Sequence, residues 1–279
     1  MEPKPAHLGP HYGAAFEADS IARAYHMRPP YPLELFDTLL KLQPTGPRSV
    51  LDLGCGTGEV ALGLLGRVDQ IDAVDPSEAM LRVARARVGG DDPSIRWICA
   101  AAESFEFRGP YSLIVAAESL HWMDWEVVLP KVAQALSERA SLALALGRSL
   151  EDVPWRAGLA ALMDEYSTNR EYRPYDLVAE LTQRGLFREV GRHATRPVAF
   201  QQSIDDYVES FHTRNGFSRE RMRRESAAEF DSALRELVSR SCPAGVVAGQ
   251  TVASVVWGVP LATSRGSTVS GTLRRTSFR

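Results

Sequence analysis

Cysteine is scarce in this chain. Only Cys55, Cys99 and Cys242 occur among 279 residues, and they are widely spaced. No two of them form a C-x-x-C pair, so the sequence offers neither a disulfide framework nor a zinc site. We therefore expect no metal, and we expect the protein to work in the reducing environment of the cytoplasm.

An excess of charge of one sign is also missing. The net charge is -3, from 32 basic and 35 acidic residues, which gives no general attraction to nucleic acid or to anionic membranes. The arginines within residues 219–230 are interrupted by Glu220, Glu225 and Glu229 and have no aromatic residues for base stacking among them. This pattern is typical of a solvated helix face, so neither nucleic acid nor a membrane is expected as a partner.

Long hydrophobic runs are absent as well. The N-terminal stretch MEPKPAHLGPHYG lacks the apolar centre of a signal peptide. The longest apolar stretch, residues 246–262, is interrupted by Gln250, Thr251 and Ser254. It is too short and too polar to span a bilayer, and we predict a buried strand there.

What the chain does contain is an alternation of short apolar runs and helical patterns between residues 33 and 150. The predicted strands are RSVLDLG, QIDAVD, IRWICA, YSLIVAA and SLALALG. The predicted helices cover residues 33–42, about 57–66, 76–88 and 125–138, with Pro130 either kinking the last one or marking its start. This order indicates an α/β fold with a doubly wound sheet.

Beyond Gly147 the alternation changes. Helices are predicted over 152–166 and 175–187, followed by one strand over 191–203. Residues 204–240 form a charge-rich helical stretch, and 251–258 a last strand. Apolar residues recur at helical spacing in the charged stretch, which indicates one buried face (Ala227, Phe230, Leu234 and Leu237). The tail, residues 263–279, contains no acidic residue and is expected to be disordered.

The first predicted strand of the sheet ends in a loop with glycines at the alternate positions 54, 56 and 58. A dinucleotide site needs its third glycine where Glu59 stands, and a P-loop needs Gly-Lys-Ser/Thr, so neither phosphate-binding pattern is present. The pattern D-x-G-x-G-x-G is expected to expose backbone amides and to leave room for a ligand. The alternative is a tight turn without a ligand, for which one glycine would suffice.

Asp75 ends the next predicted strand, 21 residues after Gly54. An acidic residue there can accept hydrogen bonds from both hydroxyls of a ribose. Its alternative role is to cap the helix that follows Pro76. Together with the glycine loop, Asp75 indicates a nucleoside ligand without a pyrophosphate.

The motifs VLDLGCGTGE, VDPSEAML and AAESLHWMDW, with AYHMRPPYP at residues 24–32, resemble the class I S-adenosylmethionine-dependent methyltransferases. Within them the chain is most similar to the small-molecule group that includes trans-aconitate methyltransferase, over residues 12–260. The resemblance implies a Rossmann-like fold with a seven-stranded, mostly parallel sheet and a helical cap insertion. It also implies S-adenosylmethionine as cofactor, S-adenosylhomocysteine as product, and a monomer or homodimer.

The same resemblance assigns cofactor residues. The methionine part is expected beside Gly54, Cys55 and Gly56, and the ribose at Asp75. Residues expected to flank the adenine or to complete the cofactor site are Asp52, Thr57, Pro76, Met80, Ala102, Glu103 and Ala117. Many relatives carry an aspartate where this chain has Ala101, so Glu103 or a backbone carbonyl is expected to accept from the adenine amino group.

Two further segments are candidates for the site. Tyr25, Arg28 and Tyr31 are predicted to form a lid, with Arg28 pairing with the cofactor carboxylate. The alternative is a surface turn made rigid by prolines. His121 and Trp122 follow the fourth strand, at the edge where doubly wound sheets bind ligands. His121 is predicted to act on the substrate either as a general base or as an orienting group, and Trp122 either lines the acceptor pocket or only packs.

These predictions divide the chain into a lid segment (1–32), a cofactor-binding core (33–150), the remainder of the sheet (151–262) with a cap at 204–240, and the tail. The predicted function is methyl transfer to a small-molecule acceptor, with a carboxylate or hydroxyl oxygen favoured. One alternative is a non-methylating S-adenosylmethionine-binding protein, such as a cyclase or a regulatory binder. Another is a nucleic-acid methyltransferase, whose Asp/Asn-Pro-Pro-Tyr/Phe motif is replaced here by AAESLHW.

Overall fold

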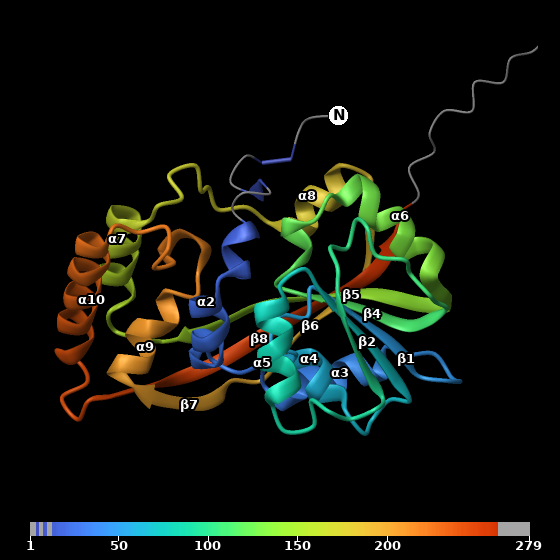
Figure 1. Cartoon of the computed structure of the whole chain (residues 1–279), viewed down its shortest axis with the longest axis horizontal. Coiled ribbons are helices and arrows are strands. Elements are labelled where there is room, and N and C mark those ends of the chain that lie inside the picture. Colours follow the sequence, from blue (N-terminus) through green and yellow to red (C-terminus); the bar gives the residue numbers. More distant parts are fainter. Residues whose placement is uncertain (1–3, 6–7, 10–12, 262–279) are drawn as a thin grey trace, which may run out of the picture.

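The computed structural model describes residues 4–5, 8–9 and 13–261, so the tail predicted to be disordered lies outside the described residues. Eight strands form one sheet in the order β3-β2-β1-β4-β5-β8-β6, with β7 paired beside β8. Helices cover both faces of this sheet, and a second group of helices packs at one end (Figure 1).

The first half of the sheet is parallel. It contains β1 (Ser49–Leu53), β2 (Gln70–Asp75), β3 (Ile95–Cys99), β4 (Tyr111–Ala117) and the pairing part of β5 (Leu136–Glu151). Parallel neighbours need long crossovers, and α4 (Glu59–Leu64), α5 (Glu78–Ala86) and α6 (Trp125–Ala135) supply three of them. The prediction of a doubly wound, mostly parallel sheet is confirmed.

The second half is antiparallel and is organised by β8 (Val246–Pro260). One edge of β8 pairs with β5, and the other pairs with β6 (Phe187–Ala194) and then with β7 (Val198–Ser203). The single strand predicted over 191–203 was therefore wrong. Pro197 lies between the two strands, and proline has no N–H for a continuous ladder. Seven strands form the continuous order, and β7 is the addition.

The two faces of the sheet are buried by different helices. One cluster of buried residues joins α3 (Leu33–Lys41) and α4 to β1 and β2. The other joins α6 and α8 (Leu177–Gln183) to β4 and β5. Helix α6 begins at Trp125 because the Asp124 side chain accepts from the N–H groups of Glu126 and Val127, so Pro130 lies inside the helix.

A separate core lies at the far ends of β5 and β8, under α7 (Arg156–Tyr166), α9 (Ile204–Phe211) and α10 (Arg224–Ser239) (Figure 1). The stretch predicted as helical over 204–240 is thus two helices. The loop between them contains Asn215-Gly216, a pair that favours turns. This core is joined to the rest of the chain by the two longest strands.

The N-terminal segment packs as short helices beside the parallel sheet. It contains η2 (Ala14–Glu17), α2 (Asp19–Ala24) and η3 (Tyr25–Met27). Ile21 and Ala22 of α2 are buried against Ala79 and Met80 of α5. These contacts fix the N-terminal segment next to the ends of β1 and β2.

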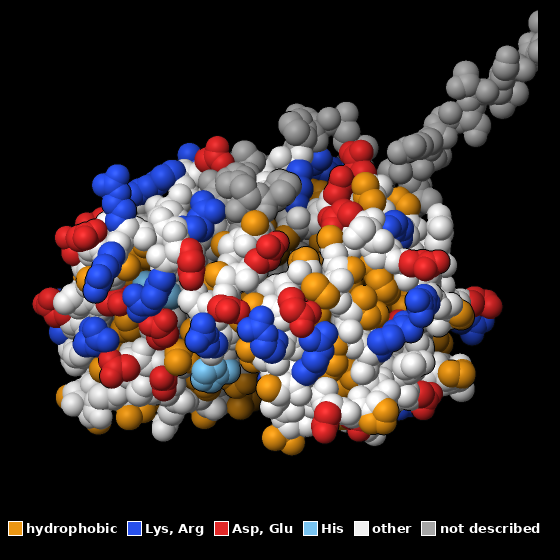
Figure 2. Space-filling view, in the orientation of Figure 1, with side chains coloured by type: hydrophobic (Ala, Val, Ile, Leu, Met, Phe, Trp, Pro, Cys, Tyr) orange, Lys and Arg blue, Asp and Glu red, His pale blue; other side chains and the backbone are white. Residues whose placement is uncertain are grey.

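Charges on the surface are mixed. Figure 2 shows basic and acidic side chains interspersed over one face. Arg219 pairs with Glu209 and Asp231, and Arg235 pairs with Asp205, as expected for a solvated helix face. Among the described residues, no helix has the length and apolarity needed to cross a membrane.

We expect Phe230→Ala to destabilise the α7–α9–α10 core strongly. Phe230 is fully buried, and its ring contacts those of Phe211, Phe217 and Tyr166. Removing a buried ring of this kind lowers the free energy of unfolding by about 3–5 kcal/mol. Urea denaturation measures this loss, with the exposed Ser232→Ala on the same helix as control. A loss no larger than that of the control would contradict the packing described.

Candidate active site

A cavity of about 1090 Å³ lies at the carboxyl ends of β1, β2 and β4. This is the edge at which doubly wound sheets hold their ligands. Most of the predicted site residues line it, namely Tyr25, Arg28, Gly54, Gly56, Asp75, Pro76, Met80, Ala102, Glu103, Ala117, His121 and Trp122. Its size is at the upper end of the range for small-molecule sites.

The glycine loop makes room for this cavity but does not offer free amides. Gly54, Gly56 and Gly58 all have positive φ, at 75°, 53° and 78°. A Cβ on Gly54 would meet the Ser119 Cβ at 2.5 Å, so only glycine allows the loop to approach the end of β4. The N–H groups of Gly54 and Cys55 both donate to the Val74 carbonyl. The expectation of exposed amides was therefore wrong for these residues, because the loop is hydrogen-bonded to β2.

Asp75 is held in a fixed orientation by the backbone. One oxygen accepts the Gly56 N–H at 2.8 Å and the other accepts the Ser77 N–H at 2.9 Å. Burial raises the pKa of Asp75, while these two hydrogen bonds lower it. A carboxylate has about four lone-pair positions, so two remain for a ligand that enters the cavity. This geometry fits the ribose of S-adenosylmethionine.

Three predicted cofactor residues do not line the cavity. Asp52, Cys55 and Thr57 are buried in the interior of the protein. One oxygen of Asp52 accepts the Ala61 N–H at 3.1 Å, and the other is buried without a partner. Burial raises the pKa of Asp52 to about 7. Asp52 thus joins β1 to α4, and contact of these three residues with the cofactor stays a prediction.

The predicted adenine end is formed by residues after β2 and β3. Ser77 caps α5 by accepting the Met80 N–H at 3.2 Å, which places Pro76 and Met80 along the cavity wall. Ala100, Ala101 and Ala102 line the opposite side. One oxygen of Glu103 accepts the Asp124 N–H at 2.7 Å, so this carboxylate is partly engaged within the chain.

The N-terminal segment covers part of the cavity. Phe16 and Trp122 have ring centroids 5.6 Å apart, and both residues line it. Lys4 donates to the Met123 carbonyl at 2.9 Å, and burial lowers the pKa of its ammonium to about 8. Glu17 lines the cavity and raises the pKa of Asp75. Sequence reasoning missed Lys4, Phe16 and Glu17 because their role depends on how the segment folds back.

A cluster of buried, paired charges lies next to the cavity. Arg148 of β5, with 4% of its side chain exposed, pairs with Glu59 of α4 and with Glu118 after β4. The rings of Tyr25 and Tyr31 lie against its guanidinium, at 5.4 and 4.7 Å from the ring centroids. Sequence reasoning missed Glu118 and Arg148, although Glu118 follows a predicted strand directly and the position was a recognisable signal.

Arg28 joins the lid segment to α9. Its guanidinium donates to the Thr213 hydroxyl at 2.8 Å and to the Thr213 carbonyl, and lies 3.9 Å from Glu118. It also lies over the Tyr25 ring. Because these contacts engage Arg28 within the chain, its pairing with a cofactor carboxylate stays a prediction.

The predicted substrate residues also line the cavity. His121 and Trp122 lie in η4 (Leu120–Trp122), with ring centroids 4.6 Å apart. Arg214 and Asn215, from the loop after α9, line the same cavity. Sequence reasoning missed both, because no local pattern marks them. Within the described part of the chain, no group of three His, Cys, Asp or Glu residues could hold a metal ion.

The buried Asp52 predicts how stability depends on pH. Its folded-state pKa of about 7 lies above its ordinary value of 3.8, so the folded protein retains a proton that the unfolded chain releases. The free energy of unfolding should therefore fall as the pH rises from about 4 to 7, by about 1.4 kcal/mol per unit of pKa difference at most.

Urea denaturation between these pH values, with Asp52→Asn for comparison, measures this effect. The amide cannot ionise, so the variant should lose stability less steeply over the same range. Equal slopes in the two proteins would show that Asp52 is ionised in the fold. The comparison removes the contribution of Asp75, which is present in both.

Comparison with known proteins identifies the domain. Residues 50–139 match the family described as a methyltransferase domain. A Saccharomyces cerevisiae protein described as an S-adenosylmethionine-dependent methyltransferase is 30% identical over 122 residues, 42% of each chain. The trans-aconitate 2-methyltransferase of Yersinia pestis is 32% identical over 124 residues, 43% of this chain and 46% of that one. The matched segment spans less than half the length of these two relatives.

The fold of the chain also occurs in a solved structure. A structure from Anaeromyxobacter dehalogenans, described as a candidate type II methyltransferase, superposes with a TM-score of 0.57 and 23% identity. The match covers 84% of this chain and 97% of that one. By sequence, residues 50–139 match a methyltransferase domain, and the chain shares the fold of a structure described as a methyltransferase.

Proposed function

We propose that this chain transfers a methyl group from S-adenosylmethionine to an oxygen, carboxylate or hydroxyl, of a small-molecule acceptor. The observation that carries the proposal is that two kinds of residue line the same cavity. Asp75 and the glycine loop line the part that fits a nucleoside, and His121 and Trp122 line the part next to the end of β4. A nucleoside-bound methyl donor and a second small molecule can therefore be held in the same enclosure.

The relatives support a small acceptor. The Yersinia pestis relative acts, by its name, on trans-aconitate. Trp122, Phe16 and Leu186 contribute apolar surface to the cavity, and charged lining residues such as Asp75 and Arg214 can fix the orientation of a small polar molecule. On the face shown in Figure 2, basic and acidic side chains are interspersed, which does not favour nucleic acid as the acceptor.

The contribution of the protein is chiefly alignment. When bound, S-adenosylmethionine supplies a methyl group on a sulfonium, which is already an activated electrophile. Asp75, preset by the Gly56 and Ser77 N–H groups, orients the donor. Trp122 and the N-terminal segment cover part of the cavity, which reduces the access of water. Holding two reactants in line in this way contributes roughly 7–11 kcal/mol to lowering the barrier.

The direct test is a screen of carboxylate, phenol and amine metabolites, trans-aconitate among them, read out as S-adenosylhomocysteine release. A methyltransferase releases this product only when an acceptor is present. A protein that binds the cofactor for another purpose would bind S-adenosylhomocysteine but release none with any acceptor, and that result would refute the proposal.

We expect Asp75→Ala to weaken S-adenosylhomocysteine binding. The change leaves ribose hydroxyls without an acceptor and removes two hydrogen bonds that hold the loop. A loss of about 1–3 kcal/mol follows for unpaired polar groups in a buried site. Isothermal titration calorimetry measures it, with the exposed Asp91→Ala as control. Equal affinity in Asp75→Ala and wild type would remove the ribose assignment.

His121→Ala distinguishes the two acceptor chemistries. For a hydroxyl acceptor a general base contributes about 10²–10⁴-fold, so kcat should fall by that factor and the wild-type rate should rise with pH. A carboxylate acceptor is already ionised, so the change should raise mainly KM. We propose the orienting role. Steady-state kinetics over a range of pH, with the exposed His26→Ala as control, tests it; a large loss of kcat would show that His121 is the base.

A further inference from the structure

Arg214 is a cation without a matching anion at the edge of the cavity. It lies in the loop after α9, is partly buried, and lines the cavity. Its guanidinium lies over the ring of the fully buried Phe211, 4.3 Å from the centroid. Among the described residues its side chain forms neither a hydrogen bond nor an ion pair. Stacking fixes the position of a guanidinium while leaving its N–H donors available.

The charges around Arg214 do not balance. Its charged neighbours are Arg28, Glu118 and Arg148. Both Glu118 and Glu59 are already paired with Arg148, and Arg28 also lies beside Glu118. Three guanidinium groups thus share two carboxylates. Burial and the nearby Arg28 lower the pKa of Arg214 to about 10, so the group is still charged at neutral pH.

Asn215 adds an unsatisfied amide at the same place. It is 8% exposed, lines the cavity, and has both amide atoms buried without a hydrogen-bond partner. Buried polar groups are nearly always paired, and an unpaired one destabilises the fold until a ligand or water satisfies it. Arg214 and Asn215 are consecutive and line the same cavity, and together a guanidinium and an amide donor can bind an oxyanion.

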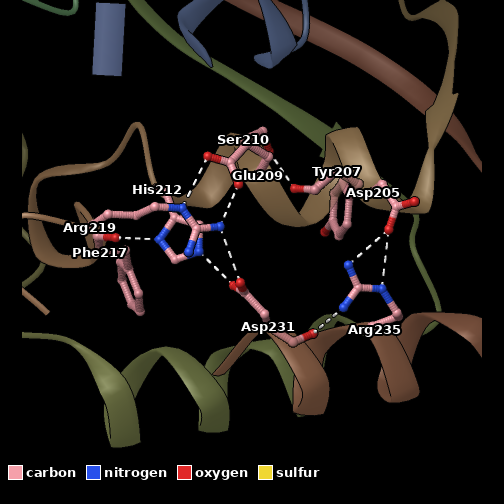
Figure 3. A network of polar contacts seen from close by, with 9 residues as sticks. All are labelled: Asp205, Tyr207, Glu209, Ser210, His212, Phe217, Arg219, Asp231 and Arg235. Atoms are coloured by element: carbon pink, nitrogen blue, oxygen red, sulfur yellow. Dashed lines mark hydrogen bonds and ion pairs between the residues drawn. The ribbon is translucent and has the colours of Figure 1, made fainter. Parts of the chain in front are cut away.

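The loop that carries both residues is held rigidly. The His212 ring contacts the Phe217 carbonyl through Nδ1 at 2.7 Å and the Asp231 carboxylate through Nε2 at 2.5 Å (Figure 3). Arg219 pairs with both Glu209 and Asp231. This network joins the end of α9 to α10 on both sides of residues 214 and 215. The subsite is therefore set before a ligand arrives.

We propose that Arg214 and Asn215 form a subsite that binds and orients a carboxylate of the methyl acceptor. This inference rests on the proposed function, because it assigns the subsite to the acceptor of that reaction. Glu118, one of the charged neighbours of Arg214, directly follows β4 and lies three residues before His121. Asp75, at the predicted ribose position, has Glu17 as its charged neighbour instead. The subsite thus belongs to the acceptor end of the cavity.

The test uses malonate as the anionic probe and malonamide as its neutral counterpart, titrated calorimetrically with and without S-adenosylhomocysteine. Wild type should bind malonate saturably and malonamide not at all. Arg214→Met should weaken malonate binding about tenfold or more, as expected for a lost charge-assisted hydrogen bond. Arg214→Lys, which keeps the charge but loses the planar fork, should be intermediate. Asn215→Ala provides a second variant, and the exposed Arg223→Met controls for loss of charge.

The titrations also show whether the subsite binds the carboxylate of the acceptor or that of the cofactor. S-adenosylhomocysteine affinity should be unchanged in Arg214→Met, and with an acceptor found by screening the variant should raise KM more than it lowers kcat. If the cofactor affinity falls instead, the subsite holds the cofactor carboxylate and the inference is wrong. Absence of malonate binding to wild type, or equal binding to Arg214→Met, also overturns it. If the wild-type protein does not bind S-adenosylhomocysteine, the proposed function is wrong, and the malonate result is not affected.

Discussion

The pairing of the buried Arg148 guanidinium is the interaction on which the site depends. A buried charge is strongly unfavourable unless it is paired, and the partners of Arg148 come from different parts of the chain. Glu59 begins the helix after the glycine loop, Glu118 follows β4, and Tyr25 and Tyr31 belong to the N-terminal segment. Meeting this one requirement brings these elements together around the cavity.

The same requirement explains a strained backbone position. Glu118 has φ of 51°, a conformation that is unfavourable for a residue with a Cβ. Its carboxylate reaches Arg148 from there and also lies near the Tyr31 hydroxyl and Arg28. Since Ser119, the next residue, packs against Gly54, the turn after β4 and the glycine loop constrain one another.

The antiparallel half of the sheet supports a second core beside the cavity, and the loop after α9 contributes Arg214 and Asn215 to the cavity lining. Both β5 and β8 continue past the parallel strands, and their far ends carry the α7–α9–α10 core. Hydrogen bonds from Arg28 to Thr213 join that core to the N-terminal segment. The cavity therefore lies beside both cores, with Asp75 lining it at the end of β2 and Arg214 lining it in the loop after α9.

The sequence by itself determined the parallel half of the fold and many of the residues that line the cavity at its edge. Continuous apolar runs and the alternating glycines are local signals, so β2 and β4 were predicted with their observed bounds and Asp75 was predicted at the cavity edge. The lid contacts of Arg28, the division of 191–203 into two strands, and the roles of Arg148 and Arg214 were decided only in the tertiary structure. Each depends on residues distant in sequence whose charges and hydrogen-bonding groups must be satisfied together once they are buried, and no local pattern records such a requirement.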